Sequence, residues 1–527
     1  MTSGAAGRGT EEHFEPKLLE SLGVPVRRLA LDSRRLHPGD VFLAYAGEAR
    51  DGREFIPQAI DAGAGAVLWE SRGFRWDPAW KVPNLPVPGL RAAAGAIASH
   101  VYGHPSEKLW LIGATGTNGK TSVTHWIAQA MSALGRTTAL IGTLGLGFPG
   151  DLRASGTTTP DPVALQESLA EFVARGASCV AMEVSSHALE QGRVNGVRFA
   201  CALFTNLSRD HLDYHGSMDR YAAAKARLFR WPRLTHAVLN LDDAFGRELA
   251  RELRGAGPEV VGYGFSPEAL KLAGGEGFAL VRGEDLSLDA RGIRFRVDSP
   301  WGEALVQSPM LGRFNGENLL AALAALLVSS VELEPAVQAL EAVGPVPGRL
   351  EQLGGGAQPL VVVDYAHTPD ALEKVLLTLR EALCGSGCRV PGSDRSESTA
   401  ERDSRTPKLL CVFGCGGERD RGKRPLMGEV VSRLADLAYV TSDNPRGEGP
   451  RRIIEEITAG MGANHRVVED RASAIYEALA FAAPGDVVLI AGKGHEAYQE
   501  MQGRRLPFSD VEAARTALAH LADEGRA

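Results

Sequence analysis

The sequence predicts an α/β protein of three domains, and three observations support this. The chain has 527 residues, which at roughly 150 residues per domain corresponds to three or four domains. Strand and helix patterns alternate from Leu109 to about Leu241, an order typical of a mostly parallel sheet with helices on both faces. Three further apolar strands follow the linker Gly344–Gly348, and each ends in a loop of reactive residue types.

The composition excludes several classes of protein. Hydrophobic residues make up 44% of the chain and charged residues 23%, a balance typical of globular proteins with buried cores. The 57 Lys and Arg residues against 65 Asp and Glu residues give a net charge of −8, which would repel a nucleic-acid backbone. We therefore expect no nucleic-acid partner.

The cysteine count and the apolar runs indicate a cytoplasmic protein. Six cysteines in a chain of this length are too few for a disulfide scaffold, which favours a reducing compartment. Residues Met1–Pro16 are polar or small, and the longest apolar run, Leu319–Val328, is half the length of a membrane span. We expect no export signal, no membrane partner and a monomer.

The first predicted domain covers residues 1–107. After a polar tail, short apolar runs at Val41–Ala46 and Ala66–Trp69 alternate with Gly and Asp turns. This order predicts a compact α/β unit that ends in the Pro-rich stretch Val82–Pro88. A helix predicted over Arg91–Tyr102 leads to the second domain.

The second predicted domain covers residues 108–344. A strand at Leu109–Gly113 runs into a Gly-rich turn and a helical pattern that starts near Lys120. Between about Leu272 and Gln307 apolar residues alternate with a period of two, which predicts a small antiparallel sheet appended to this domain.

The third predicted domain covers residues 345–527 and has the pattern of a Rossmann-like sheet. Its strands are predicted at Leu360–Val363, Leu409–Phe413 and Val487–Ile490. Such sheets bind ligands beyond the C-terminal ends of their strands. The polar stretch Gly385–Lys408 has almost nothing to bury and predicts a mobile surface insertion.

The sharpest local signal is the Gly-rich segment Gly113-Ala-Thr-Gly-Thr-Asn-Gly-Lys-Thr121. In such loops backbone N–H groups surround phosphates, Lys120 would reach the terminal phosphates, and Thr121 would help to hold Mg²⁺. Ala114 stands where the strict phosphate-loop pattern has glycine. A plain strand-to-helix turn is the alternative, but the order of strand, glycines, Lys-Thr and helix favours an ATP-binding loop.

Two more segments carry possible metal ligands. Strand Cys179–Met182 ends at Glu183, an acid placed to ligate Mg²⁺ or, alternatively, to cap a turn. The segment Thr205–His215 is dense in His and Asp, but its spacing fits no standard zinc site, so zinc is the weaker interpretation. The pairs Cys384/Cys388 and Cys411/Cys415 also lack zinc spacing, and His215 stays unassigned.

Taken together, the motifs resemble those of one family. The segments Gly116–Thr121, Met182–His187, Asn206–His211 and Gly312–Asn318 look like those of the Mur ligases of peptidoglycan synthesis. Further segments are similar to family members that add meso-diaminopimelate, namely Asp364–Pro369, Gly414–Asp420, Asp443–Arg446 and Gly492–Glu496. The resemblance covers about residues 26–515.

This resemblance implies an ATP-dependent ligase that joins meso-diaminopimelate to UDP-N-acetylmuramoyl-L-alanyl-D-glutamate through an acyl phosphate. The N-terminal domain would hold the UDP end, with Ser33 as a contact. The residues that match muramoyl-dipeptide positions are Thr158, Thr159, Ser185, Gln191 and Arg193.

The resemblance also implies ATP and Mg²⁺ as cofactors. The residues that match ATP positions are Gly116, Thr117, Asn118, Gly119, Lys120, Thr121, Asn315, Asn318, Arg349 and Asp364. The metal would be held by Thr121, Glu183, His211 and Lys225, the last as a carbamate. Lys120, Lys225 and His211 would be the catalytic residues.

For the incoming diaminopimelate the matching residues are Arg419, Asp443, Asn444, Arg446, Gly492 and Glu496. Diaminopimelate differs from lysine by a distal carboxylate, and the Arg446 guanidinium can bind that group with two hydrogen bonds. Asp-Asn-Pro-Arg is also a good turn sequence that needs no ligand. Only the presence of the second motif, Gly-Lys-Gly-His-Glu, favours the binding role.

Other activities stay open at this point. A lysine-adding ligase of the same family would share most motifs. A folylpolyglutamate synthase would share the phosphate loop and the acyl-phosphate chemistry without needing the two C-terminal amino-acid loops. A nucleotide-driven switch or transporter ATPase would explain the phosphate loop alone.

Overall fold

The computed structural model describes residues 15–48, 50–255, 257–289, 292–384 and 406–523. These residues form two compact units. Unit 1 comprises residues up to Thr115, Gly135–Ala202 and Ala224–His236, and unit 2 comprises Gly116–Leu134, Leu203–Ala223 and the chain from Ala237 onward. The predicted N-terminal tail, Cys388 and most of the predicted insertion at 385–408 lie outside the described residues.

The N-terminal part of unit 1 is a parallel sheet of four strands in the order β1-β2-β3-β4. Its elements are β1 (Leu29–Ala30), β2 (Val41–Ala44), α1 (Ile56–Asp61), β3 (Ala66–Glu70), β4 (Asn84–Val87) and α2 (Leu90–Val101). The helix predicted from Arg91 is therefore confirmed. The Pro-rich stretch is itself strand β4, and Pro86 is tolerated there because an edge strand leaves one row of N–H groups unpaired.

The rest of unit 1 contains a second sheet segment, with strand order β5-β9-β6-β7-β8. Strand β9 pairs in parallel with β5 and β6, whereas β6, β7 and β8 pair in antiparallel fashion. The elements are β5 (Trp110–Thr115), β6 (Thr138–Gly142), β7 (Gly145–Phe148), β8 (Asp151–Arg153), α4 (Pro162–Ala174), β9 (Cys179–Glu183) and α5 (Ser186–Glu190). Strand β10 (Cys201–Phe204), helix α7 (Met218–Ala226) and strand β11 (His236–Asn240) have residues in both units.

Unit 2 has strands in the order β15-β14-β13-β12-β11 and the helices around them. The elements are α3 (Lys120–Ala133), α6 (Leu212–His215), β11 (His236–Asn240), α8 (Ala244–Leu253), β12 (Glu259–Gly264), α9 (Pro267–Glu276), β13 (Ala279–Asp289), β14 (Gly292–Ser299), β15 (Gly302–Ser308), α10 (Arg313–Val328) and α11 (Leu333–Glu341). The helix predicted to start near Lys120 is confirmed.

The predicted antiparallel segment needs a correction. Strands β13, β14 and β15 do pair in antiparallel fashion, but β13 also pairs in parallel with β12, so they extend the central sheet instead of forming their own. The segment also begins later than Leu272, because Leu272 lies inside helix α9, which starts at the Ser266 cap and extends to Glu276, and β13 begins only at Ala279. Alternation of apolar and polar residues shows which residues lie on each face of a strand, but it does not show which other strand pairs with it.

The C-terminal part of unit 2 is a sheet of six strands in the order β16-β17-β21-β18-β19-β20, parallel except for β16. Its elements are β16 (Glu351–Gly354), β17 (Leu360–Asp364), α12 (Pro369–Cys384), β18 (Leu409–Phe413), α13 (Lys423–Leu434), β19 (Leu437–Val440), α14 (Pro450–Thr458), β20 (His465–Val467), α15 (Arg471–Phe481), β21 (Val487–Ala491) and α16 (Asp510–Asp523). A hairpin of β22 (Tyr498–Met501) and β23 (Arg504–Pro507) follows β21. The three predicted strands are confirmed.

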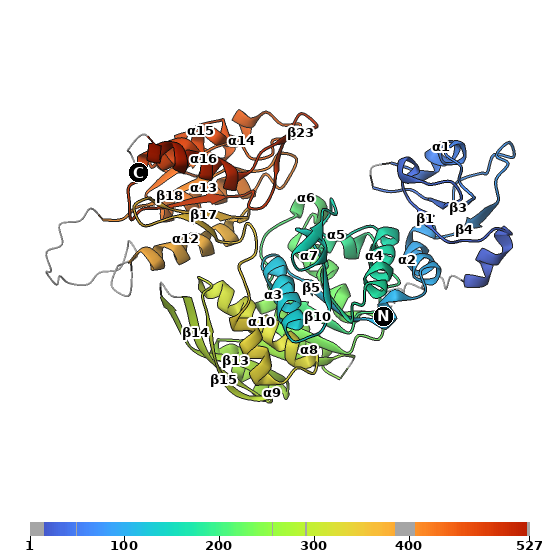
Figure 1. The fold of residues 1–527 in the computed structure, drawn as a ribbon, viewed down its shortest axis with the longest axis horizontal. Coiled ribbons are helices and arrows are strands. Elements are labelled where there is room, and N and C mark those ends of the chain that lie inside the picture. The colour runs from blue at the N-terminus through green and yellow to red at the C-terminus, as the bar shows by residue number, and fades with distance from the viewer. Residues whose placement is uncertain (1–14, 49, 256, 290–291, 385–405, 524–527) are drawn as a thin grey trace, which may run out of the picture. The chain divides into compact units, whose positions relative to one another are not determined.

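Helices cover both faces of this C-terminal sheet, because α12 and α13 contribute to the core on one face and α15 and α16 to the core on the other. Figure 1 shows α12 and α16 on opposite sides of the sheet. Alternate residues of each strand therefore enter different cores. On β21, Leu489 packs in the core with α12 and α13, whereas Val488 and Ile490 pack with α15 and α16. Burial on both faces explains why these strands are continuous apolar runs. Within the residues described, no helix combines the length and apolar character needed to span a bilayer.

Replacing Leu489 by Ala tests this packing. The side chain is fully buried, so we expect the free energy of unfolding to fall by about 3 kcal/mol, the usual cost of the lost contacts and the cavity. The measurement is urea denaturation followed by circular dichroism. Leu506→Ala on β23, where the side chain is 48% exposed, is the matched control and should leave the midpoint nearly unchanged. Equal effects of the two variants would contradict the assigned core.

Candidate active site

The phosphate loop lies between β5 and α3. Lys120 Nζ donates to the carbonyl oxygens of Gly116 and Thr117 at 2.9 Å each, so the loop curls around its own lysine. The backbone N–H groups of Thr117 and Asn118 donate to the Asn206 carbonyl and side-chain oxygens at 2.8 and 3.0 Å. The segment after β10 therefore fixes the backbone of the loop at Thr117 and Asn118.

Two glycines of this loop lie where a side chain has no room. At Gly119, with φ +86°, an added Cβ would lie 2.4 Å from the Asn318 Oδ1 atom. At Gly116, with φ +147°, it would lie 1.9 Å from the Thr205 Oγ1 atom. The left-handed backbone and the close approach together require glycine at both positions.

A pocket of about 630 Å³, including its part open to solvent, lies next to the loop within unit 2. It brings together six residues predicted to bind ATP, namely Asn118, Gly119, Asn315, Asn318, Arg349 and Asp364. On α10, the Asn318 Nδ2 group donates to Asn315 Oδ1 at 3.2 Å, which fixes both amides. A wall of amides beside a phosphate loop suits a purine, whose edge carries donors and acceptors.

Arg349 and Asp364 organise the other side of this pocket. The Arg349 Nη2 group donates to Thr121 Oγ1 at 3.0 Å, and its guanidinium lies 4.7 Å from the centre of the Tyr365 ring. Asp364 accepts hydrogen bonds from the Leu350 and Ala366 N–H groups at 2.8 and 2.7 Å. Burial raises the pKa of Asp364 while Arg349 and these bonds counteract that rise.

The pocket also contains residues that sequence reasoning missed. Tyr365 and Phe314 contribute aromatic rings, and Lys374 on α12 contributes a cation. Tyr365 and Phe314 fall inside motifs that resemble the family, directly beside the assigned Asp364 and Asn315, so adjacency was an available signal. Lys374 lies in no motif, and only the fold of α12 places it in the pocket.

Asp210 organises the segment that holds His211. Its carboxylate accepts a hydrogen bond from the His211 N–H at 2.9 Å and lies 3.3 Å from the His211 ring, 3.5 Å from Lys423 Nζ and 3.7 Å from the His367 ring. Burial alone would raise the pKa of Asp210, but His367, Lys423 and His211 hold it well below its usual range. The carboxylate thus stays charged and orients His211.

A second group of polar residues, the proposed amino-acid pocket, lies at the C-terminal ends of β19 and β21. The Asn444 Nδ2 group donates to Glu496 Oε2 at 2.8 Å. At Gly492, with φ +115°, an added Cβ would lie 2.6 Å from the Asp443 Oδ2 atom. The structure therefore brings together Asp443, Asn444, Gly492 and Glu496, four of the residues predicted to bind diaminopimelate.

Arg446 is held beside this pocket by the hairpin β22–β23. Its backbone, at φ +52°, donates to the Glu500 carbonyl at 2.9 Å and accepts from the Gln502 N–H at 2.7 Å. Its guanidinium donates to the Gly417 carbonyl at 2.7 Å and lies 3.5 Å from the Glu500 carboxylate. Arg446 and Arg419 flank Gly416, where an added Cβ would lie 2.9 Å from Arg446 Nη1 and 3.7 Å from Arg419 Cγ.

In unit 1, the residues predicted to bind the muramoyl dipeptide gather around Thr159. Its hydroxyl donates to the Glu183 carbonyl at 2.9 Å and accepts from the Ser185 N–H at 3.1 Å. The Arg193 guanidinium donates to the Thr159 carbonyl at 3.0 Å and to Gln191 Oε1 at 2.8 Å. The structure thus places these residues together, whereas Ser33 lies near the N-terminal sheet and donates to Gln58 Oε1 at 2.9 Å.

Glu183 is oriented by Thr143, a residue that sequence reasoning missed. The Thr143 N–H donates to Glu183 Oε1 at 2.8 Å and its hydroxyl to Oε2 at 3.1 Å, while Thr158 Oγ1 lies 3.2 Å from Thr143 Oγ1. Each carboxylate oxygen has two lone pairs, so one hydrogen bond on each leaves capacity for a cation. Thr143 lies in no recognised motif, which is why only the fold reveals it.

The predicted metal ligands are divided between the units. Glu183 and Lys225 belong to unit 1, and Lys225 is 1% exposed on α7, whereas Thr121 and His211 belong to unit 2. Among the described residues, no group of three or more His, Cys, Asp or Glu side chains is arranged to hold a metal ion.

The thiols of Cys179 and Cys415 are free and buried, and burial raises the pKa of each to about 12.

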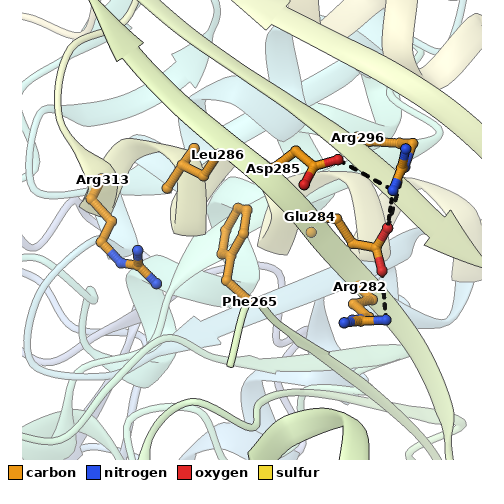
Figure 2. A pocket seen from close by; sticks show the side chains of 8 residues that line it. Phe265, Arg282, Glu284, Asp285, Leu286, Arg296 and Arg313 are labelled. Carbon is orange, nitrogen blue, oxygen red and sulfur yellow. Dashed lines mark hydrogen bonds and ion pairs between the residues drawn. The ribbon is translucent and has the colours of Figure 1, made fainter. Parts of the chain in front are cut away.

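Another hollow, on β13 and β14, contains none of the predicted site residues (Figure 2). Arg282 and Arg296 both pair with Glu284, at 2.5 and 2.6 Å, and Arg296 also lies 3.2 Å from Asp285. Arg313 lies over the Phe265 ring at 5.7 Å. Acids within the hollow thus pair with two of its arginines, and we assign it no ligand.

The fold and these sites define an α/β protein with a phosphate loop beside a polar pocket and, in its C-terminal part, a separate group of charged and amide side chains. Three family models match the chain: "Mur ligase family, catalytic domain" over residues 25–102, "Mur ligase middle domain" over 114–326, and "Mur ligase, glutamate ligase domain" over 394–494. The chain belongs to the Mur ligase family, whose members are ATP-dependent amide ligases.

Curated relatives and a solved structure match almost the whole chain. A protein of Nitrosomonas europaea named UDP-N-acetylmuramoyl-L-alanyl-D-glutamate--2,6-diaminopimelate ligase is 52% identical over 99% of this chain and 98% of its own. A protein of the same name from Chromobacterium violaceum is 51% identical over 96% and 97%. A solved structure of a ligase of that name is 36% identical, with a TM-score of 0.63, and covers 94% of this chain and 96% of its own.

Substituting Gly119 by Ala tests the geometry of the phosphate loop. The new methyl group would overlap Asn318 and strain the backbone, so we expect adenine-nucleotide affinity to fall by at least about tenfold. Isothermal titration calorimetry with ADP measures this. Gly150→Ala is the matched control, since Gly150 has almost the same φ of +87° but nothing within 4 Å of the added atom. If both variants bound ADP like the parent, the loop would not be the nucleotide site.

Proposed function

We propose that the chain joins meso-diaminopimelate to UDP-N-acetylmuramoyl-L-alanyl-D-glutamate, with conversion of ATP to ADP and phosphate. One observation supports the choice of amino acid: Asn444, Arg446 and Glu496 lie together, because Asn444 binds Glu496 and the backbone of Glu500 binds both Asn444 and Arg446. This pocket offers a guanidinium for a carboxylate and a carboxylate for an ammonium, the two groups at the distal end of diaminopimelate. The names of the relatives support the same substrate.

The phosphate loop has to overcome repulsion between two anions. A substrate carboxylate that approaches the ATP γ-phosphate to 4 Å is repelled by roughly 4 kcal/mol at an effective dielectric near 20. Lys120 offsets part of this cost. The carboxylate oxygen attacks phosphorus, the bond to ADP breaks, and the resulting acyl phosphate is attacked by a neutral amine to give an amide and inorganic phosphate.

We propose that Mg²⁺ accompanies ATP and that Thr121, Glu183, His211 and Lys225 hold it. The free lone pairs of Glu183 suit a hard cation that prefers oxygen ligands. Mg²⁺ when bound would neutralise phosphate charge. A carbamate on Lys225 would turn a buried cation into an anion with two oxygens and so add to the oxygen ligands.

The other binding roles follow from the same assignment. The UDP end of the substrate would contact Ser33, and the muramoyl dipeptide would contact Thr158, Thr159, Ser185, Gln191 and Arg193. Hydroxyls, an amide and a guanidinium suit an anionic ligand that is rich in hydroxyl groups. Arg349 and Asp364 would contact the nucleotide, Arg419 and Asp443 the amino acid, and the enzyme would work in the cytoplasm as a monomer.

The decisive experiment is release of phosphate from ATP by the purified protein with single reactants omitted. We expect phosphate release to require the UDP-muramoyl dipeptide and meso-diaminopimelate together. Release with lysine in place of diaminopimelate would indicate a lysine-adding ligase. Release with a folate and glutamate would indicate a folylpolyglutamate synthase, and release without any peptide acceptor would indicate a plain ATPase.

Arg446→Ala tests recognition of the distal carboxylate. Losing a two-point hydrogen-bonded ion pair costs about 1.5–3 kcal/mol, so we expect kcat/KM for diaminopimelate to fall by roughly 10- to 100-fold. ADP affinity should stay unchanged. Arg451→Ala, in the same domain and 88% exposed beside Glu469, is the control. Unaltered use of diaminopimelate by the Arg446 variant would refute this role.

Lys225→Ala tests the carbamate. We expect activity at limiting Mg²⁺ to fall by at least about tenfold, because the metal would lose an anionic ligand, and intact-protein mass spectrometry under bicarbonate should detect the modification only in the parent. Lys271→Ala on α9, at an exposed position, is the control. Full activity of the Lys225 variant at limiting Mg²⁺ would exclude the carbamate.

A further inference from the structure

Lys493 is a fully buried cation inside the amino-acid pocket, and none of the roles predicted from the sequence involves it. Its side chain has no solvent exposure, and it lies between Gly492 and Glu496, both of which we expect to contact diaminopimelate. A buried ammonium is costly unless it is paired and hydrogen-bonded. The partners of Lys493 therefore indicate what it contributes.

Both partners of Lys493 are residues of the pocket. The Nζ group lies 3.0 Å from Asn444 Oδ1 and 3.0 Å from Glu496 Oε2. It also lies 5.6 Å from the centre of the Tyr498 ring, a cation–π contact that helps to replace lost hydration. Lys493 thus contacts Asn444 and Glu496 from the protein interior, and the proposed ligand would contact the same two side chains from the pocket.

The contact with Asn444 fixes the direction of its amide. Asn444 Oδ1 accepts from Lys493 Nζ and from the Glu500 N–H at 2.8 Å, while its Nδ2 group donates to Glu496 Oε2. Because two donors face one end of the Asn444 amide and an acceptor faces the other, only one orientation of this amide satisfies all of its partners. Both Asn444 and Lys493 donate to Oε2 of Glu496. The Oε1 atom, 3.5 Å from the Tyr365 hydroxyl, therefore accepts fewer hydrogen bonds from the protein and has more capacity for a ligand.

The contact with Glu496 also sets the charge of the pocket. Lys493 pairs with Glu496, and Arg446 pairs with Glu500 at 3.5 Å. The two other charged residues assigned to this site, Arg419 and Asp443, have opposite signs, so the six charges sum to zero. The distal end of diaminopimelate carries an ammonium and a carboxylate and is neutral as a whole, whereas the distal end of lysine carries only an ammonium. A neutral pocket accepts the first without an unpaired charge and leaves the second with excess positive charge.

We propose that Lys493 is a positioning residue that determines specificity, because it orients Asn444 and cancels the charge of Glu496 so that the pocket selects a zwitterionic over a purely cationic distal end. The inference rests on the proposed function. It separates two contributions to selectivity, since Arg446 would attract the carboxylate of diaminopimelate and Lys493 would disfavour the lone ammonium of lysine.

The test compares kcat/KM for meso-diaminopimelate and for L-lysine in the full-length enzyme. In Lys493→Met the pocket loses one positive charge, so the ratio of diaminopimelate use to lysine use should fall by about tenfold or more. Lys493→Gln keeps an N–H donor without the charge and should lower the ratio too, with a smaller loss of diaminopimelate turnover. Lys408→Met, at the opposite end of the strands of this sheet, is the matched control.

The outcomes are distinguishable. A fall in the ratio for the Met and Gln variants, but not for the Lys408 variant, supports the proposal, and Lys493→Gln alone decides if the Met variant fails to fold by circular dichroism. A parallel loss with both amino acids, at an unchanged ratio, means a merely structural lysine and overturns it. Failure of the parent enzyme to release phosphate with diaminopimelate would instead overturn the proposed function.

Discussion

Parallel strands that are buried on both faces leave only their ends available for chemistry. In the C-terminal sheet, Leu489 packs against one helix layer and Ile490 against the other, so neither face can carry polar groups without a large cost. The reactive residues therefore collect where the strands stop. Asp364 ends β17, and Gly492 follows β21 directly. Since β17 and β21 are paired neighbours, the residues proposed to bind the nucleotide and those proposed to bind the amino acid lie at adjacent strand ends.

Tyr365 and His495 connect those two sides physically. The Tyr365 ring lies under the Arg349 guanidinium and 5.2 Å from the His495 ring, and its hydroxyl reaches toward Glu496. Burial, followed by the charge of Arg349, lowers the pKa of His495 to about 4, so this imidazole is neutral at physiological pH. The residues proposed to bind the nucleotide and those proposed to bind the amino acid are thus connected through the stacked rings of Tyr365 and His495.

How much of the fold and the site is predictable depends on the kind of signal. Strands such as Leu409–Phe413 are predictable to the residue, because a short, continuous apolar run bounded by charge and glycine is typical of a strand buried on both faces. Asn315 and Asn318 are identified by resemblance, and the pocket contains both. Thr143 and Lys493 are not, because their roles arise from burial and from partners distant in sequence, which no local pattern encodes. The Pro-rich strand β4 is missed since proline argues against a strand unless its edge position is known.

The hairpin of β22 and β23 clamps the backbone of Arg446 through hydrogen bonds on both sides. The position of the Arg446 guanidinium therefore depends on this hairpin, whose own residues are mostly solvent-accessible. Adding or removing a residue in such a ribbon shifts its register and would move the arginine tip without changing any pocket residue. A change in the length of this hairpin could therefore alter which amino acid the proposed pocket selects without any substitution among the residues proposed for catalysis.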